Sequence, residues 1–158
     1  RALTDLGATP PYGTENMKEA IREDRALKRE KNQPHGVLIV EGEKTADAAN
    51  NAIIEHWKQK YGLHHTTPWP IALSGRGGAN GLHTKTKWDV LELLKPQMIW
   101  LWPDNDTGGY TSFIEHKTES LLDKLTKQAK KWGGVVKIID LRRHPKTDLF
   151  RNKWDLAD

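Results

Sequence analysis

The chain reads Gly36-Val37-Leu38-Ile39-Val40-Glu41-Gly42-Glu43 in one stretch and Met98-Ile99-Trp100-Leu101-Trp102-Pro103-Asp104-Asn105-Asp106 in another, and both apolar runs end abruptly in acid. A short apolar run bounded by turn residues is typical of a buried strand, and open α/β sheets bind ligands at the carboxyl ends of their strands. On an extended chain, residues two apart leave the same side, and a few carboxylates with water and substrate phosphates are what holds Mg²⁺. We therefore expect Glu41, Asp104 and Asp106 to converge on one metal ion.

Hydrophobic periodicity divides the rest of the chain into alternating strands and helices. Strands are predicted at residues 36–40, 70–73, 98–102 and 135–140, and helices at 44–60, 86–95 and 109–132. Gly133 and Gly134 are expected to stop the last helix. The alternation predicts an α/β fold with a mostly parallel, four-stranded sheet and helices on both faces.

The organisation of the chain follows from its N-terminal composition. Residues 1–14 contain Pro10-Pro11 and Gly13 and suggest a linker, whereas residues 15–33 alternate acids and bases with few large apolar side chains. That second stretch is either a solvated helix tied by i,i+4 ion pairs or a phosphate-binding arm. We therefore divide the chain into a linker with a charged helix (1–34) and a domain (35–158). Because it starts without methionine and stops inside an apparent motif, we interpret it as a piece of a longer protein.

Composition narrows the functional classes. The 158 residues suit one domain, and 36% hydrophobic with 29% charged residues is ordinary for a globular protein. The apolar runs are too short to cross a membrane, so we expect no membrane partner and a cytoplasmic location. The absence of cysteine excludes disulfides and cysteine-based zinc sites. A formal charge of +4 and a pI near 9.2 fit attraction to nucleic acid.

Four motifs in order carry a family resemblance: Val40-Glu41-Gly42-Glu43-Lys44-Thr45-Ala46-Asp47-Ala48, Ser74-Gly75-Arg76-Gly77-Gly78-Ala79, Trp102-Pro103-Asp104-Asn105-Asp106 and Trp154-Asp155-Leu156-Ala157-Asp158. Together they resemble a TOPRIM domain, the catalytic module of bacterial-type primases, type IA and type II topoisomerases and some nucleases. The likeness is strongest to phage and plasmid primases or primase-helicases, and it covers roughly residues 36 to 158.

The resemblance implies a Mg²⁺-dependent (or Mn²⁺-dependent) nucleotidyltransferase, a DNA primase that makes RNA primers for replication. Glu41 would act as general base or metal ligand at the attacking 3′-hydroxyl, Asp104 and Asp106 would bind the ion, and Asp155 would support a second ion. The implied partners are a single-stranded DNA template, nucleoside triphosphates and a fused or partner helicase. A nuclease and a non-catalytic nucleic-acid or partner-binding scaffold are the alternatives; a topoisomerase is disfavoured, because no tyrosine has supporting context.

Phosphate contacts are expected from Lys44 and from the glycine-rich loop that contains Arg76, Gly77 and Gly78, whose backbone can approach an anion closely. The same glycines are equally compatible with a tight turn, and Lys44 with an ion pair. The family pattern often places aspartate where this chain has Thr45. The nearest acid, Asp47, either approaches the site or favours the helix N-terminus.

Other motifs are set aside. Gly42-Glu43-Lys44-Thr45 lacks the glycines of a P-loop, and the histidines have no metal-binding spacing. Trp100 and Trp102 alternate with Leu101, so we expect them to pack in the fold rather than to stack on bases.

Overall fold

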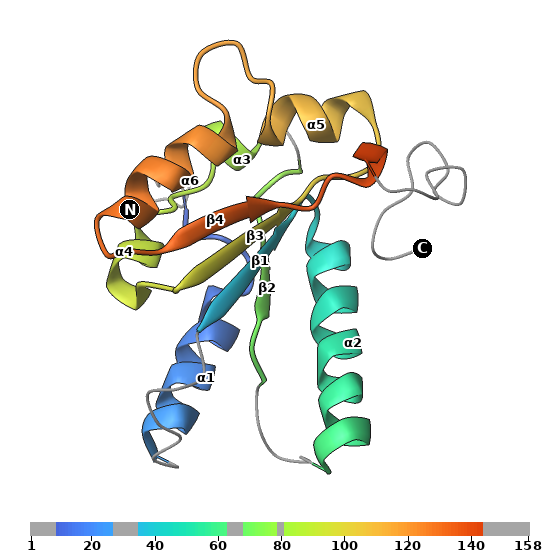
Figure 1. The fold of residues 1–158 in the computed structure, drawn as a ribbon, viewed down its shortest axis with the longest axis vertical. Coiled ribbons are helices and arrows are strands. Elements are labelled where there is room, and N and C mark those ends of the chain that lie inside the picture. The colour runs from blue at the N-terminus through green and yellow to red at the C-terminus, as the bar shows by residue number, and fades with distance from the viewer. Residues whose placement is uncertain (1–8, 27–34, 63–67, 79–80, 144–158) are drawn as a thin grey trace, which may run out of the picture.

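The computed structural model of the chain centres on one parallel sheet (Figure 1). It describes residues 9–26, 35–62, 68–78 and 81–143. The strands are β1 (Gly36–Val40), β2 (Ile71–Ser74), β3 (Met98–Trp102) and β4 (Val135–Ile138). Their order in the sheet is β2-β1-β3-β4, and every neighbouring pair is parallel. The predicted α/β fold with a four-stranded sheet is thus confirmed, and it is Rossmann-like.

The helices cover both faces of the sheet, as expected. They are α1 (Thr14–Ala26), α2 (Glu43–Tyr61), α3 (Gly81–Thr84), α4 (Val90–Leu94), α5 (Thr107–Phe113) and α6 (Leu121–Lys130), and a 3₁₀ turn, η2 (Leu141–Arg143), follows β4. Among the described elements, α2 alone supplies the helix core of one face, through Ala46 and Ala49. The other helices, α5 and α6 included, share the opposite face.

The strands show why both faces are needed. Every residue of β1 is buried, and on β3 the fully buried Ile99 and Leu101 alternate with half-buried tryptophans. Ile99 and Leu101 enter the larger core, whereas Trp100 and Trp102 pack beside the α2 helix. The predicted packing role of both tryptophans is therefore confirmed.

The charged N-terminal helix is part of this core. In α1, Met17 and Ala20 are fully buried against sheet residues, while Lys18–Glu15 and Arg22–Glu19 ion pairs lie on its exposed side. The expectation of a solvated helix tied by ion pairs therefore holds for one side of α1 only. Both ion pairs join residues three positions apart (i,i+3), not four as predicted.

The predicted helix over 109–132 is wrong as a single element. The chain leaves α5 after Phe113 and starts α6 at Leu121. Ser120 caps the new helix, because its Oγ accepts a hydrogen bond from the Asp123 backbone N–H at 3.0 Å. Phe113, Leu121 and Leu125 still share one core, so the apolar pattern fits two short helices as well as one long helix.

Four other predicted ranges change. The helix expected over 86–95 contracts to α4, with Lys95 in a left-handed conformation at its end. The strand expected over 135–140 ends at Ile138. The 70–73 strand lies one residue later, and the 44–60 helix gains one residue at each end.

The outer edge of β2 is covered by side-chain and backbone contacts. The Asn50 amide pairs with both backbone groups of Ala72, donating to its carbonyl at 3.1 Å and accepting from its N–H at 2.8 Å. Tyr12 forms a two-bond antiparallel bridge with Ser74. The segment expected as a linker therefore docks on the sheet from Thr9 onward, where a second bridge joins it to Thr86.

Candidate functional site

Glu41 and Asp104 follow two neighbouring strands, β1 and β3, from which the chain continues to opposite sides of the sheet. β1 leads into α2 on one face, and β3 leads into α5 on the other. A crevice opens at the carboxyl end of such a strand pair, because the two connections leave on opposite sides. Val40 and Trp102, the last residues of the two strands, are register partners. The structure thus places the half-buried Glu41 and Asp104 just after the ends of two adjacent parallel strands.

Asp106 has a structural task as well. It caps α5: its Oδ1 accepts a hydrogen bond from the Gly109 backbone N–H at 2.7 Å. Its own N–H donates to the Asp104 carbonyl at 2.8 Å. One carboxylate oxygen of Asp106 is therefore directed at the helix, although the residue stays half-buried beside Asp104.

Gly109 makes this tight turn possible. A Cβ at Gly109 would lie 2.5 Å from the Asp104 carbonyl oxygen and 2.8 Å from its nitrogen. The start of α5 therefore packs directly on the Asp104 backbone.

The described residues do not form a ready-made metal cage. Within residues 9–26, 35–62, 68–78 and 81–143, no group of three or more His, Asp or Glu side chains is placed to hold a metal ion. Glu41 and Asp104 follow adjacent strands, and Asp106 turns one oxygen toward α5. The predicted ligand Asp155 lies outside the described residues.

The glycine-rich loop after β2 lies at the same edge of the sheet. Gly77 and Gly78 adopt positive φ values of 81° and 68°, which glycine tolerates best, so the tight-turn reading applies. The Arg76 guanidinium is 3.4 Å from the Glu43 carboxylate and 5.5 Å from the centre of the Tyr12 ring. About 45% of the Arg76 side chain remains exposed.

Positions 44, 45 and 47 separate in the first turns of α2. Lys44 is exposed, and Thr45 is buried. The Asp47 carboxylate accepts the Tyr12 hydroxyl hydrogen bond, with O···O distances of 2.9 and 3.1 Å. This hydrogen bond raises the pKa of Tyr12 above its ordinary value. Asp47 therefore anchors the N-terminal segment, a role that the sequence reasoning missed.

A second polar site, beside Asp106, was also missed. A cavity of about 370 Å³ is lined by Asn105, Asp106, Thr107, Tyr110, Glu115 and Arg142. Arg142 and Glu115 are 27 positions apart, and local spacing carries no signal for such a pair. The sequence signal that could have indicated this site is the pair of arginines, Arg142 and Arg143, after the last strand.

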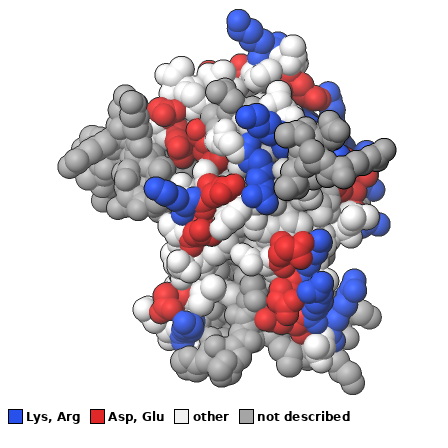
Figure 2. All heavy atoms as spheres, turned by 180° about the vertical axis from the view of Figure 1, so that it is seen from behind, with Lys and Arg blue, Asp and Glu red and all other residues white. Residues whose placement is uncertain are grey.

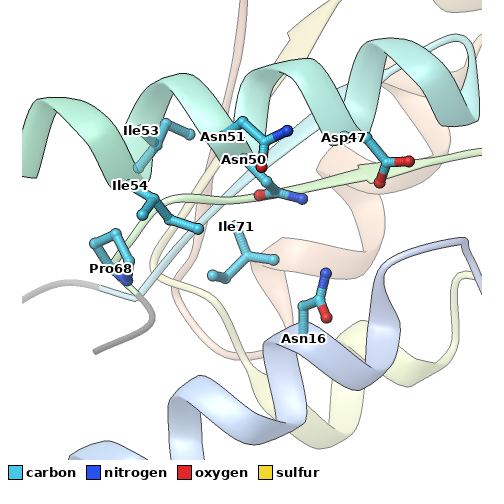
Figure 3. A pocket seen from close by; sticks show the side chains of 8 residues that line it. All are labelled: Asn16, Asp47, Asn50, Asn51, Ile53, Ile54, Pro68 and Ile71. Carbon is cyan, nitrogen blue, oxygen red and sulfur yellow. The ribbon is translucent and has the colours of Figure 1, made fainter. Parts of the chain in front are cut away.

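Another cavity, of about 340 Å³, lies between α1 and α2 over the β2 edge (Figure 3). Its wall combines amides and one carboxylate with apolar side chains: Asn16, Asp47, Asn50, Asn51, Ile53, Ile54, Pro68 and Ile71. Neither Glu41 nor Asp104 lines this cavity.

Charges are mixed on the face seen in Figure 2. Basic and acidic side chains lie next to one another there, and neither sign covers that face continuously. Two of the bases near the sheet edge, Arg76 and Arg142, are paired with acids. The positive net charge is therefore not concentrated into one visible stripe on this face.

No family model matches the chain, and no curated protein or solved structure matches it either. In the described part of the chain, none of the helices is long and apolar enough to span a membrane.

Proposed function

We propose that this domain is the nucleotidyl-transfer core of a primase of the TOPRIM type, which joins nucleotides on a single-stranded DNA template with the help of Mg²⁺ or Mn²⁺. One observation carries the proposal: Glu41 and Asp104 end adjacent parallel strands at the reversal point of the sheet. Ligands of open α/β sheets bind at such points. The ordered motifs give the site its suggested chemistry.

The donor chemistry fits Mg²⁺. This ion prefers oxygen ligands and is usually held by one or two carboxylates together with water and substrate phosphates. Glu41 and Asp104 would supply two carboxylates, and the Asp106 oxygen that does not cap α5 would be a third donor only after these side chains move closer together. A bound Mg²⁺ would neutralise triphosphate charge and align the reacting groups.

The chain's own residues would then orient the reactants. Glu41 would accept the proton of the attacking 3′-hydroxyl, or hold the ion that activates it, and Asp104 would hold the ion. Arg76 and Lys44 would contact phosphates of the template or the triphosphate. Arg76 is already at the sheet edge, where a phosphate would compete with Glu43 for its guanidinium.

Metal titration tests the first step. We expect Mg²⁺ calorimetry and Mn²⁺-induced NMR broadening to report binding by the wild type and at least tenfold weaker binding by Asp104→Asn. The exposed Asp89→Asn is the matched control, because the Asp89 side chain makes no capping hydrogen bond. Equal binding by all three proteins would leave only a non-catalytic scaffold.

A variant at Asp106 must distinguish its role as the cap of α5 from its proposed role as a metal ligand. Serine caps helices as well as aspartate does but carries no charge, whereas alanine removes both functions. If Asp106 serves the ion, Asp106→Ser keeps the stability of the wild type and loses activity. If it is a cap only, Asp106→Ser keeps both.

Product analysis distinguishes the reactions. With single-stranded DNA, ribonucleoside triphosphates and Mg²⁺, a primase yields new oligonucleotides, and a nuclease yields shortened strands because water replaces the 3′-hydroxyl. Either product must disappear in Asp104→Asn to support this site. Helicase partnership is tested by adding the helicase of the same replication system and measuring primer yield.

A further inference from the structure

The Arg142 guanidinium lies over an aromatic ring beside the proposed site. Its guanidinium carbon is 3.8 Å from the centre of the Tyr110 ring, which is a close cation–π contact. Tyr110 is 5% exposed, and its hydroxyl donates to the Asn105 side chain at 3.0 Å. The ring is therefore a fixed base for the guanidinium.

Two acids fix the orientation of the guanidinium. Asp140 accepts from Nε at 2.9 Å and from Nη2 at 3.0 Å, and Glu115 accepts from Nη1 at 3.0 Å. The Asp140 side chain is only 7% exposed, and its hydrogen bonds from Arg142 lower its pKa. Carboxylates bound to its edges fix the orientation of a guanidinium, so little side-chain entropy is lost when a flat ligand stacks on it.

The cavity that Arg142 lines suits a base better than a phosphate. Its volume, about 370 Å³, is at the small end of ligand pockets. Asp106 and Glu115 in its wall oppose an anion, and Arg142 is already neutralised by two acids. Thr107 adds a hydroxyl that can donate or accept a hydrogen bond. About 40% of the Arg142 side chain is exposed.

We propose that Arg142, supported by Tyr110, is a stacking platform for a nucleobase in the cavity next to Asp106. Guanidinium planes and aromatic rings are common supports for unstacked bases. This inference rests on the proposed function, because it places the base of a nucleotide whose phosphates face the Glu41–Asp104 crevice. The base comes either from a nucleoside triphosphate or from the single strand.

Base binding can be measured without catalysis. The probes are 2-aminopurine riboside triphosphate, a short single strand that contains 2-aminopurine, ribose 5-triphosphate and a fully abasic strand. We expect Arg142→Lys, which keeps the charge and loses the plane, to weaken one base-containing probe about 5- to 30-fold and to abolish its fluorescence quenching. The base-free probes should bind equally, and Arg143→Lys, at a side chain that is 87% exposed, should behave as wild type. The probe that responds identifies the source of the base.

Photocrosslinking of the wild type covers the case in which Arg142→Lys fails to fold. A 5-iodouracil probe should crosslink to a peptide that contains Tyr110. Unchanged affinity in folded Arg142→Lys, or a crosslink only elsewhere, would overturn the platform. Both measurements are repeated without Mg²⁺ and in Asp104→Asn. If base binding depends on Arg142 but metal binding does not depend on Asp104, this inference is supported and the proposed function is refuted. If metal binding depends on Asp104 but base binding does not depend on Arg142, only this inference is refuted.

Discussion

Gly109 sets the distance between α5 and Asp104, and its replacement is a direct test of that packing. We expect Gly109→Ala to destabilise the fold by about 1–3 kcal/mol, because its Cβ would meet a backbone oxygen at 2.5 Å and neither group can swing away. The affinity of this variant for Mg²⁺ should also fall, because the Asp104 backbone must shift to make room for the new Cβ. Urea unfolding and Mg²⁺ calorimetry measure the two effects.

Gly108→Ala is the matched control for that substitution. The nearest atom to its added Cβ is the Asp106 Oδ1 at 3.3 Å, at the end of a side chain. Alanine also favours a helix over glycine by about 0.5–1 kcal/mol. Stability within about 1 kcal/mol of the wild type is expected, and an equal loss in both variants would mean that α5 does not pack on Asp104 as described.

His83 couples stability to pH. Burial lowers its pKa, and the neighbouring His116 and Lys124 lower it further, while its hydrogen bond to the Ser112 carbonyl acts in the opposite direction. As the pH falls, His83 takes up a proton in the unfolded chain at a higher pH than in the folded chain, because its pKa is lower in the folded state. The stability due to neutral His83 is therefore complete above about pH 6.5 and is lost as the pH falls through the pKa of the folded state.

We therefore expect His83→Gln to flatten the loss of stability between about pH 7.5 and 5. Glutamine can still donate a hydrogen bond to the Ser112 carbonyl, and the exposed His56→Gln serves as the control. The measurement is urea unfolding across the pH series. Parallel curves for wild type and His83→Gln would contradict the assignment.

At the scale of elements, β2 is an edge strand whose outer backbone groups are covered by other parts of the chain. Sheet edges with open backbone groups promote association with other chains. Asn50 occupies the N–H and carbonyl of Ala72, and Tyr12 occupies those of Ser74. Helix α2 and the N-terminal segment together therefore protect this strand.

Asn50→Ala should expose that edge. The loss of both hydrogen bonds to the fully buried Ala72 is expected to cost about 1–3 kcal/mol and to increase self-association. Urea unfolding and light scattering measure the two outcomes. The neighbouring Asn51→Ala, at an exposed residue that lines the same cavity, should change neither quantity. Similar losses in both variants would argue against the edge role.

The break between α5 and α6 shows which elements the sequence predicts well. Hydrophobic periodicity over 109–132 predicted one apolar face, and Phe113, Leu121, Leu125 and Ala129 do share one core. The break was missed because no glycine or proline marks residues 114–120. Its signal was Ser120 followed by Asp123, a helix-start pattern that periodicity alone does not weigh.

For the whole molecule, mixed charge predicts weak dependence of nucleic-acid binding on salt. Each phosphate contact on a single strand contributes about −0.7 to the slope of log K against log salt. If Lys44 and Arg76 make the contacts, the slope should be about −1 to −2. Titration of a labelled single strand between about 50 and 200 mM salt gives this value. A slope steeper than about −3 would require a basic groove that these residues do not supply.

The sequence by itself determined the sheet, its parallel class, the helices on both faces and the placement of Glu41 and Asp104 after strands, because burial and chain direction follow from local apolar runs. It also identified the tryptophans of β3 as packing residues. The metal and primase assignments come from motif resemblance and remain proposals.

Only the tertiary structure decided which side chains meet. It joined Asp47 to Tyr12, and it assembled Arg142 with Tyr110 and Glu115. These contacts join residues far apart in the sequence, which are brought together by sheet order and by the two sides on which helices cross it. Local spacing encodes neither, because the choice among long-range partners is made by packing the whole core.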